Sequence, residues 1–296
     1  MLIFDIYIII NILEVVNLMQ VLSMKDYFGK DATRLLTKKL FLFDMDGTVY
    51  LGDRLFDGVA KLLKKIENDG GRYVFITNNA SKSVKDYVAK LHRMGLSQVN
   101  DEHFYTSAQA TLQLMQEKYA DQVIYVQATK SFVEEFKAGG LHITTEYSDE
   151  AKVILVAFDP EFTGEKVSTT CKMLTKHDLP YYATNPDWVC PVDFGYIPDC
   201  GSMCEGFYRA TGKRPIFIGK PEPTMIYEVM KKFHTEPQDT VVIGDRLYTD
   251  IAAGRNAGVD TVCVLSGEVT LEEILSAKDT EKPTFVLKSV KDLILY

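Results

Sequence analysis

The chain has 296 residues, of which 46% are hydrophobic and 25% charged, and its formal net charge is -8. The length leaves room for two domains, and the composition is ordinary for a globular protein. The acidic charge argues against nucleic acid or an anionic membrane surface as the main partner. The five cysteines are odd in number and fit no zinc-binding spacing, so we expect reduced thiols in a cytoplasmic protein.

Residues 1–23 form a strongly apolar segment without a lysine or arginine. They lack the basic region and small-residue cleavage site of a signal peptide. Polar residues such as Asp5, Asn11 and Glu14 interrupt the segment, which a membrane span tolerates poorly. We therefore expect no membrane partner. Either the segment packs on the body as an amphipathic element, or Met24 is the natural start.

Apolar runs alternate with stretches of helical periodicity after Met24. Predicted strands cover residues 40–43, 73–76 and 104–105, and predicted helices cover 57–69, 83–94 and 108–118. Strands that alternate with helices predict a parallel sheet with right-handed crossovers.

The pattern starts afresh near residue 121 and returns near residue 200. The second block has predicted strands at 123–125, 153–157 and 181–184, helices at 130–138 and 164–176, and an irregular stretch at 188–200. The third block has predicted helices at 202–210, 222–233, 248–257 and 270–277, and strands at 216–218, 240–243, 261–265 and 284–287. We predict an α/β fold: a doubly wound parallel-sheet core of residues 24–106 and 200–296, interrupted by a smaller α/β domain at 107–199.

Two acids, Asp44 and Asp46, follow the first buried strand in the sequence Phe41-Leu-Phe-Asp-Met-Asp-Gly-Thr. Side chains alternate along a strand, so the two carboxylates share a face. Their mutual repulsion calls for a hard cation or a shared proton. An ordinary Asp-Gly turn is the simpler alternative.

Three later segments also place polar groups at strand ends. Thr77, Asn78 and Asn79 follow the second strand and could bind phosphoryl oxygens, although Thr and Asn also cap helices. Lys220 precedes a proline-rich helix start, where it could neutralise a phosphate or a carboxylate, although most lysines are solvated. Asp245 ends another apolar strand and suits a metal ligand.

Asp250 lies five residues beyond Asp245, near the first turn of the next helix. Its carboxylate could orient the residues that bind the metal, or it could simply interact favourably with the helix dipole. All four segments lie at carboxyl ends of predicted parallel strands, which gather loops into one crevice. Acids, amides and one lysine together suit phosphoryl transfer with Mg²⁺.

The set Asp44-Met-Asp46-Gly-Thr, Thr77-Asn-Asn, Lys220-Pro and Gly244-Asp245 with Asp250 resembles the haloacid dehalogenase superfamily of phosphatases, which has a Rossmann-like core. The insertion, the Ala183-Thr-Asn-Pro-Asp187 block and Gly219-Lys-Pro-Glu-Pro223 are similar to its para-nitrophenyl phosphatase and nucleotidase-like (NagD-type) subgroup, which carries a type IIA cap domain. The resemblance covers residues 38–290 and leaves out residues 1–23.

The resemblance implies that Asp44 attacks phosphorus and becomes an aspartyl phosphate, while Asp46 protonates the leaving oxygen and then activates water. It implies a Mg²⁺ site formed by the side chains of Asp44 and Asp245 and the backbone carbonyl of Asp46. Thr77 and Asn78 would then hold phosphoryl oxygens, and Lys220 would steady the nucleophile and phosphate.

The cap would close over the site, with Asn185 and Asp187 as candidate contacts, and caps of this type can mediate homodimers. We therefore expect a magnesium-dependent phosphatase acting on a small phosphorylated metabolite such as a nucleotide monophosphate, a sugar phosphate or an aryl phosphate. A signalling receiver domain is an alternative, but receivers are about half as long and lack an inserted domain. A third possibility is an inactive relative that only binds phosphate.

Overall fold

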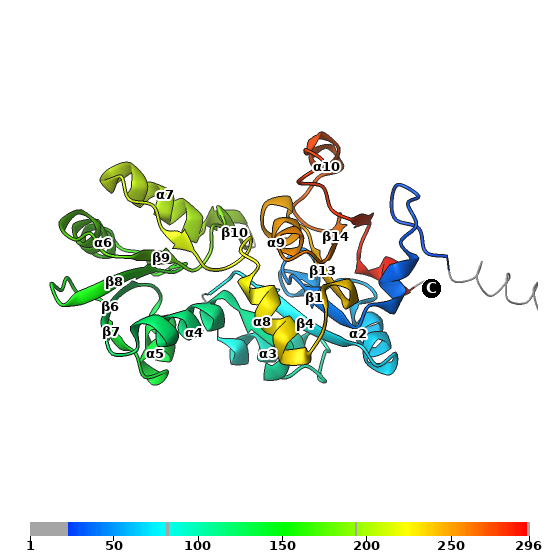
Figure 1. Cartoon of the computed structure of the whole chain (residues 1–296), viewed down its shortest axis with the longest axis horizontal. Coiled ribbons are helices and arrows are strands. Elements are labelled where there is room, and N and C mark those ends of the chain that lie inside the picture. Colours follow the sequence, from blue (N-terminus) through cyan, green and yellow to red (C-terminus); the bar gives the residue numbers. More distant parts are fainter. Residues whose placement is uncertain (1–22, 81–82, 193, 295–296) are drawn as a thin grey trace, which may run out of the picture.

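The computed structural model describes residues 23–80, 83–192 and 194–294, which form two adjoining lobes, each built around a parallel sheet (Figure 1). Of the predicted apolar extension at 1–23, residues 1–22 lie outside the described residues. Within the described ranges, no helix combines the length and the apolar character needed to cross a membrane.

The first sheet has six parallel strands in the order β15-β14-β13-β1-β4-β5. In that order they span Phe285–Leu287, Asp260–Val264, Thr240–Gly244, Leu40–Phe43, Arg72–Thr77 and Phe104–Thr106. The central strand β1 pairs on one side with β4 and on the other with β13, from the far end of the sequence.

Alternation along β1 gives the first sheet two apolar faces. Leu40 and Leu42 belong to the cluster under the helices α4, α8 and α9, which span Ser107–Tyr119, Thr224–Phe233 and Ala252–Asn256. Phe41 and Phe43 belong to the opposite cluster, under α2 and α3, which span Val59–Asn68 and Val84–Arg93. Helix α10, Leu271–Ser276, packs through Ile274 on a smaller cluster near β14 and β15. Both faces are buried, as sheets of parallel strands require.

The second sheet has five parallel strands in the order β12-β9-β8-β6-β7. In that order they span Ile216–Phe217, Tyr181–Ala183, Ala151–Val156, Val123–Gln127 and His142–Thr144. Helix α5 (Lys130–Ala138) packs on one face, and α6 (Gly164–Lys176) and α7 (Cys200–Thr211) pack on the other. The predicted α/β architecture of parallel sheets and helices is therefore confirmed.

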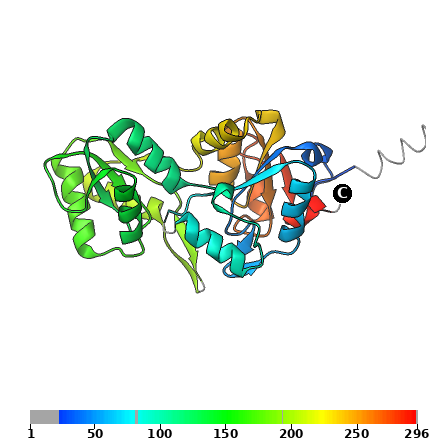
Figure 2. The same cartoon turned by 90° about the horizontal axis from the view of Figure 1, so that it is seen from below.

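Two short antiparallel hairpins lie beside the sheets. One joins β2 (Tyr50–Leu51) to β3 (Arg54–Leu55), directly after the acid pair. The other joins β10 (Val189–Val192) to β11 (Gly195–Pro198) and stands out between the two lobes (Figure 2). We predicted residues 188–200 to be irregular, but most of them form this hairpin. Both of its strands are edge strands, and edge strands tolerate proline because the missing N–H is not needed for pairing.

The return to the first lobe also differs from the prediction. We expected residues 202–210 and 216–218 to belong with the first sheet. Instead, α7 packs on α6, and β12 hydrogen-bonds to β9 in the second sheet. The chain returns only with α8. The predicted helix 248–257 begins with a π-helical turn over Leu247–Ile251 before it continues as α9.

The topology brings the ends of three neighbouring strands to one edge. Strands β1, β4 and β13 all run in the same direction, so the residues after Phe43, Ile76 and Gly244 lie next to one another. In open α/β sheets, ligands bind outside such carboxyl ends. This edge faces the second lobe (Figure 1).

Candidate active site

Asp44 follows β1 and forms a short ion pair with Lys220, with 2.6 Å between Oδ1 and Nζ. The same ammonium lies 2.6 Å from Oδ1 of Asp250 and donates to the backbone carbonyl of Ile76 at 3.1 Å. Only 2% of Lys220 is exposed, so its three N–H donors are all used inside the protein. Lys220 therefore links the strand ends of β1 and β4 to the turn after β13.

Burial and the neighbouring charges shift the pKa values of Lys220 and Asp44. Burial alone would lower the pKa of Lys220, but the carboxylates of Asp250 and Asp44 outweigh it and raise that pKa, so the lysine stays charged. Burial, followed by the neighbouring charge of Asp250, raises the pKa of Asp44 well above its usual range, although Lys220 opposes the shift. The site thus holds more negative charge than one lysine neutralises.

Asp245 completes an acidic cluster at the end of β13. Carboxylate oxygens of Asp44, Asp245 and Asp250 all lie within 4.8 Å of one another. Oδ2 of Asp245 accepts a hydrogen bond from the Glu268 N–H at 2.7 Å, whereas Oδ1 is buried and has no hydrogen-bond partner in the described part of the chain. Burial and the Asp250 charge raise the pKa of Asp245 to about 7.

This cluster fits a divalent cation. An unsatisfied buried carboxylate oxygen is costly, and an oxygen-only set of donors suits a hard ion such as Mg²⁺. Close packing holds Asp245 in place: a Cβ atom added to Gly267 would lie 1.9 Å from Asp245 Oδ2, and one added to Gly47 would lie 2.3 Å from it. The main chain therefore fixes this carboxylate from two sides.

The side chain of Asn78 braces the neighbouring loop. Its Oδ1 accepts from the Lys220 N–H at 2.8 Å, and its Nδ2 donates to the Lys220 carbonyl at 2.9 Å and to Oδ2 of Asp187 at 2.6 Å. Both amide N–H groups are thus engaged within the protein. The Oγ1 atom of Thr77, at the end of β4, accepts from the backbone N–H of Asn79 at 3.2 Å.

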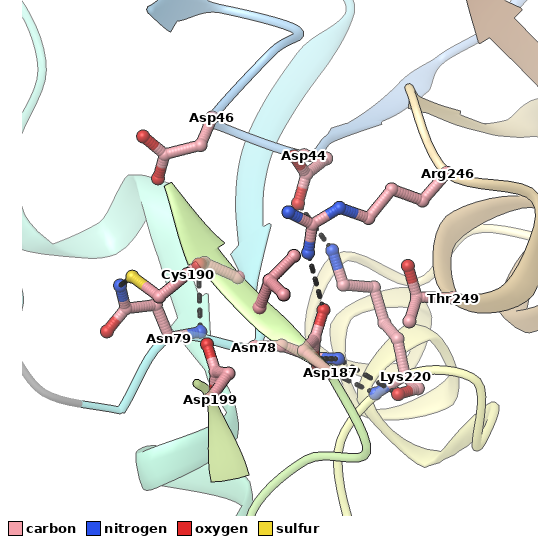
Figure 3. A pocket seen from close by; sticks show the side chains of 12 residues that line it. Asp44, Asp46, Asn78, Asn79, Asp187, Cys190, Asp199, Lys220, Arg246 and Thr249 are labelled. Atoms are coloured by element: carbon pink, nitrogen blue, oxygen red, sulfur yellow. Dashed lines mark hydrogen bonds and ion pairs between the residues drawn. The ribbon is translucent and has the colours of Figure 1, made fainter. Parts of the chain in front are cut away.

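The second lobe reaches this site through a buried polar network. Asn185 donates to Asp187 at 2.9 Å and to Asp199 at 3.0 Å, and Asp187 forms an ion pair with Arg246 at 2.6 Å. The Nε atom of Arg246 also lies 2.7 Å from the Glu268 carboxylate. Figure 3 shows the guanidinium lying across the pocket, between Asp44 and Asp187.

Two adjoining cavities open at the strand ends. A small one, about 30 Å³, is lined by residues of both lobes: Asp44, Asp46, Thr77, Asn78, Asn79, Asp187, Val189, Cys190, Asp199, Lys220, Arg246 and Thr249. A larger one, about 730 Å³, lies between the β2–β3 hairpin, α3 and the β10–β11 hairpin. Asp46, Asn79 and Cys190 line both cavities, so Asp46 lies at their junction.

The structure brings the predicted residues together. Asp44, Asp46, Thr77, Asn78, Asn79, Asp187 and Lys220 line the small cavity, Asp245 and Asp250 lie in the acidic cluster behind it, and Asn185 lies in the network beneath Asp187. Sequence reasoning missed Arg246, Thr249, Asp199 and Cys190. Arg246 directly follows a strand-end acid, which could have drawn attention to it, whereas nothing in the sequence around Cys190 signals its position.

The sequence is similar to proteins of known families. Residues 41–142 match the family described as Haloacid dehalogenase-like hydrolase, and residues 217–293 match the family described as HAD-hydrolase-like. The chain is 31% identical to 5'-nucleotidase YutF of Bacillus subtilis over 260 residues, which covers 88% of this chain and 99% of that protein.

Solved structures of phosphatases are also similar to this chain. A 4-nitrophenylphosphatase from Thermotoga maritima superposes with a TM-score of 0.82 at 34% identity, covering 89% of this chain and 98% of that one. A glycerol phosphate phosphatase from Mycobacterium tuberculosis in complex with magnesium gives a TM-score of 0.80 at 26% identity, covering 91% of this chain and 78% of that one. The names of these similar proteins share phosphate removal and differ in the group that carries the phosphate.

Proposed function

This chain belongs to the haloacid dehalogenase-like hydrolases and is a phosphatase of the NagD type, and from that membership we propose a Mg²⁺-dependent reaction through an aspartyl phosphate at Asp44. One observation carries the proposal: Asp44 lies within 2.6 Å of the Lys220 ammonium and beside the carboxylates of Asp245 and Asp250. The proposed nucleophile, the lysine ammonium and an acidic cluster that could hold a metal therefore meet at one edge of the first sheet.

Asp44 would act as the nucleophile. Its carboxylate attacks phosphorus, the bond to the leaving oxygen breaks, and that oxygen takes a proton from Asp46. Water then gives a proton to Asp46 and attacks the phosphorus, which releases phosphate and restores Asp44. Lys220 supports this chemistry because its ammonium holds Asp44 in position and offsets the charge of the phosphoryl group.

The metal would be held by the side chains of Asp44 and Asp245 and by the backbone carbonyl of Asp46. When bound, Mg²⁺ would offset the repulsion among the carboxylates of Asp44, Asp245 and Asp250 and neutralise part of the phosphoryl charge. The unpartnered Oδ1 of Asp245 supports this assignment. Asp250 would remain a supporting acid, because its carboxylate binds Lys220 and accepts from the Arg246 N–H at 3.1 Å.

The phosphoryl oxygens would be bound at the end of β4. The hydroxyl of Thr77 is suited to this, whereas the side-chain amide of Asn78 is already used to brace Lys220. Asn79 lines both cavities and would lie beside the ester oxygen. The second lobe, which we propose to be the cap domain, would contribute Asp187 and, through Asn185, hold that carboxylate in place.

The domain division that we propose differs from the sequence-based one only at its second boundary. The cap would run from residue 107 to β12, because α7 and β12 pack within its sheet. The substrate would be a small phosphomonoester whose leaving group enters the cavity of about 730 Å³. A homodimer and a cytoplasmic location stay predictions.

An assay with 4-nitrophenyl phosphate tests the proposal. We expect activity that requires Mg²⁺ and disappears with a chelator, and we expect Asp44→Asn to lower kcat by at least about 10³-fold. Circular dichroism would check that the variant is folded. Metal-dependent activity retained by Asp44→Asn would contradict the role of Asp44, and activity unaffected by a chelator would contradict the role of the metal.

A further inference from the structure

Asp46 occupies an unusual place between two cavities. It lines the small cavity that holds Asp44 and Lys220, and it also lines the large one. Figure 3 shows its carboxylate pointing away from Asp44. A proton donor to the leaving oxygen needs this junction, but it also needs a fixed orientation, because proton transfer demands hydrogen-bond geometry.

Tyr50 contacts this carboxylate directly. Its hydroxyl donates to Oδ2 of Asp46, with 3.2 Å between the two oxygens, and none of its surface is exposed. Tyr50 also lines the large cavity, so the hydrogen bond lies at the wall where a leaving group would enter.

The backbone fixes Tyr50 relative to Asp46. The Gly47 N–H donates to the Tyr50 carbonyl at 2.8 Å, the Tyr50 N–H donates to the Met45 carbonyl at 3.2 Å, and Asp46 and Tyr50 form a β-bridge. The turn therefore sets the distance between the two side chains, and a movement of the ring would require the turn to open.

A lysine side chain also contacts the face of the Tyr50 ring. The ammonium of Lys90, on α3, lies 3.8 Å from the ring centroid, which is a close cation–π contact. Such a contact withdraws electron density from the phenol and favours its hydroxyl as a donor. The contact also connects the turn after β1 to a helix of the same lobe.

We propose that Tyr50 is a positioning residue that orients Asp46 for proton transfer to the leaving oxygen. This inference rests on the proposed function of Asp46. Tyr50 keeps its own proton throughout: the proton that moves comes from Asp46 and goes to the leaving oxygen as the phosphorus–oxygen bond breaks. Its contribution should therefore grow with the need of the leaving group for that proton.

A series of aryl phosphates tests this dependence. 4-Nitrophenyl phosphate has a good leaving group that needs little protonation, whereas phenyl phosphate has nearly the same shape and a much more basic leaving oxygen. We expect Tyr50→Phe to lower kcat/KM about 10-fold for phenyl phosphate and less than about 2-fold for 4-nitrophenyl phosphate. A purely structural role would lower both by the same factor.

Tyr87→Phe is the matched control. Tyr87 is another buried tyrosine that lines the large cavity, but its hydroxyl donates to the carbonyl of Asn79 at 3.1 Å. Its loss should affect both substrates equally. In an Asp46→Asn background, Tyr50→Phe should no longer change the ratio of the two substrates, because coupled residues are not additive. If Tyr50→Phe does not fold, Tyr50→Leu should show the same ratio.

The outcomes separate the two proposals. If the wild-type protein has no activity that depends on Asp44 and Asp46, the proposed function fails. If that activity is present and Tyr50→Phe changes both substrates by one factor, or accelerates phenyl phosphate hydrolysis, only the role of Tyr50 is overturned.

Discussion

Arg246 and Asp187 join the two lobes through an ion pair, with 2.6 Å between Nη1 and Oδ1. Both side chains are largely buried, with 14% and 4% of their surfaces exposed. The other carboxylate oxygen of Asp187 accepts hydrogen bonds from Asn78 and Asn185. The contact thus combines residues from both sheets at the wall of the small cavity.

Asp187→Asn should destabilise the protein by about 3 kcal/mol, because it leaves Arg246 facing an amide in a buried site. The midpoint of urea unfolding measures the change. Asp279→Asn is the control: Asp279 pairs with Lys282 at 2.9 Å but is 95% exposed, so its loss should cost less than about 1 kcal/mol. Equal midpoints for Asp187→Asn and the wild-type protein would contradict the prediction.

Asp199 should make stability fall as pH rises. Burial, and then the neighbouring charge of Asp187, raises the pKa of Asp199 to about 7. The folded state therefore binds the proton more tightly than the unfolded state, and stability decreases between about pH 4 and pH 7 by up to about 4 kcal/mol. Urea unfolding at pH 5 and pH 8 measures this loss.

Asp199→Asn isolates that effect. Its amide oxygen can still accept from the Cys200 N–H and Asn185, but it carries no charge at any pH. The variant should exceed the wild-type protein in stability by a larger margin at pH 8 than at pH 5. Parallel pH profiles for the two proteins would show that Asp199 does not titrate in this range.

Mg²⁺ should stabilise the folded protein by binding the acidic cluster. A ligand present at 100 times its Kd adds about 2.7 kcal/mol, so Tm should rise by roughly 5 °C relative to NaCl of equal ionic strength. Asp245→Asn should remove the rise. Asp53→Asn should keep it, because Asp53 lines the large cavity and lies outside the cluster. A rise of equal size in Asp245→Asn would place the metal elsewhere.

Gly267→Ala should displace Asp245 without changing any charged residue. The added Cβ atom would lie 1.9 Å from Asp245 Oδ2, so the carboxylate must move and the Mg²⁺-dependent rise in Tm should shrink. Gly206→Ala provides the control: nothing lies within 4 Å of its Cβ position in α7, so alanine should stabilise that helix by about 0.5–1 kcal/mol. An unchanged rise in Gly267→Ala would contradict the tight packing.

Most of the fold could be predicted because long apolar runs and helical periods are local signals. Leu40–Phe43 and α6 both follow this rule. The sheet that a short strand joins is not a local signal. Ile216 is 60% exposed in a strand of two residues, and only its pairing with Tyr182 shows that it belongs to the second sheet.

The candidate site was predictable where its residues end strands of the first sheet, because the topology alone brings Asp44, Thr77 and Asp245 to one edge. Lys220 instead follows β12 of the second sheet and reaches Asp44 from the other lobe. Side-chain partners were less accessible. The Asn78 amide was expected to face phosphate, but it braces Lys220, a residue 142 positions away. Arg246 pairs with Asp187 across the lobe boundary, and no spacing in the sequence reveals such a contact.

The pairing of β1 with β13 also sets an order for folding during synthesis. These neighbours in the first sheet are separated by 200 residues, since Leu40 pairs with Thr240. Ribosomes add about 5–20 residues per second, so roughly 10–40 s pass between them. All strands of the second sheet emerge within that interval. The inserted lobe can therefore be complete while one edge of β1 still awaits its partner, and a nascent chain stalled before β13 would hold a folded second lobe beside an open first sheet.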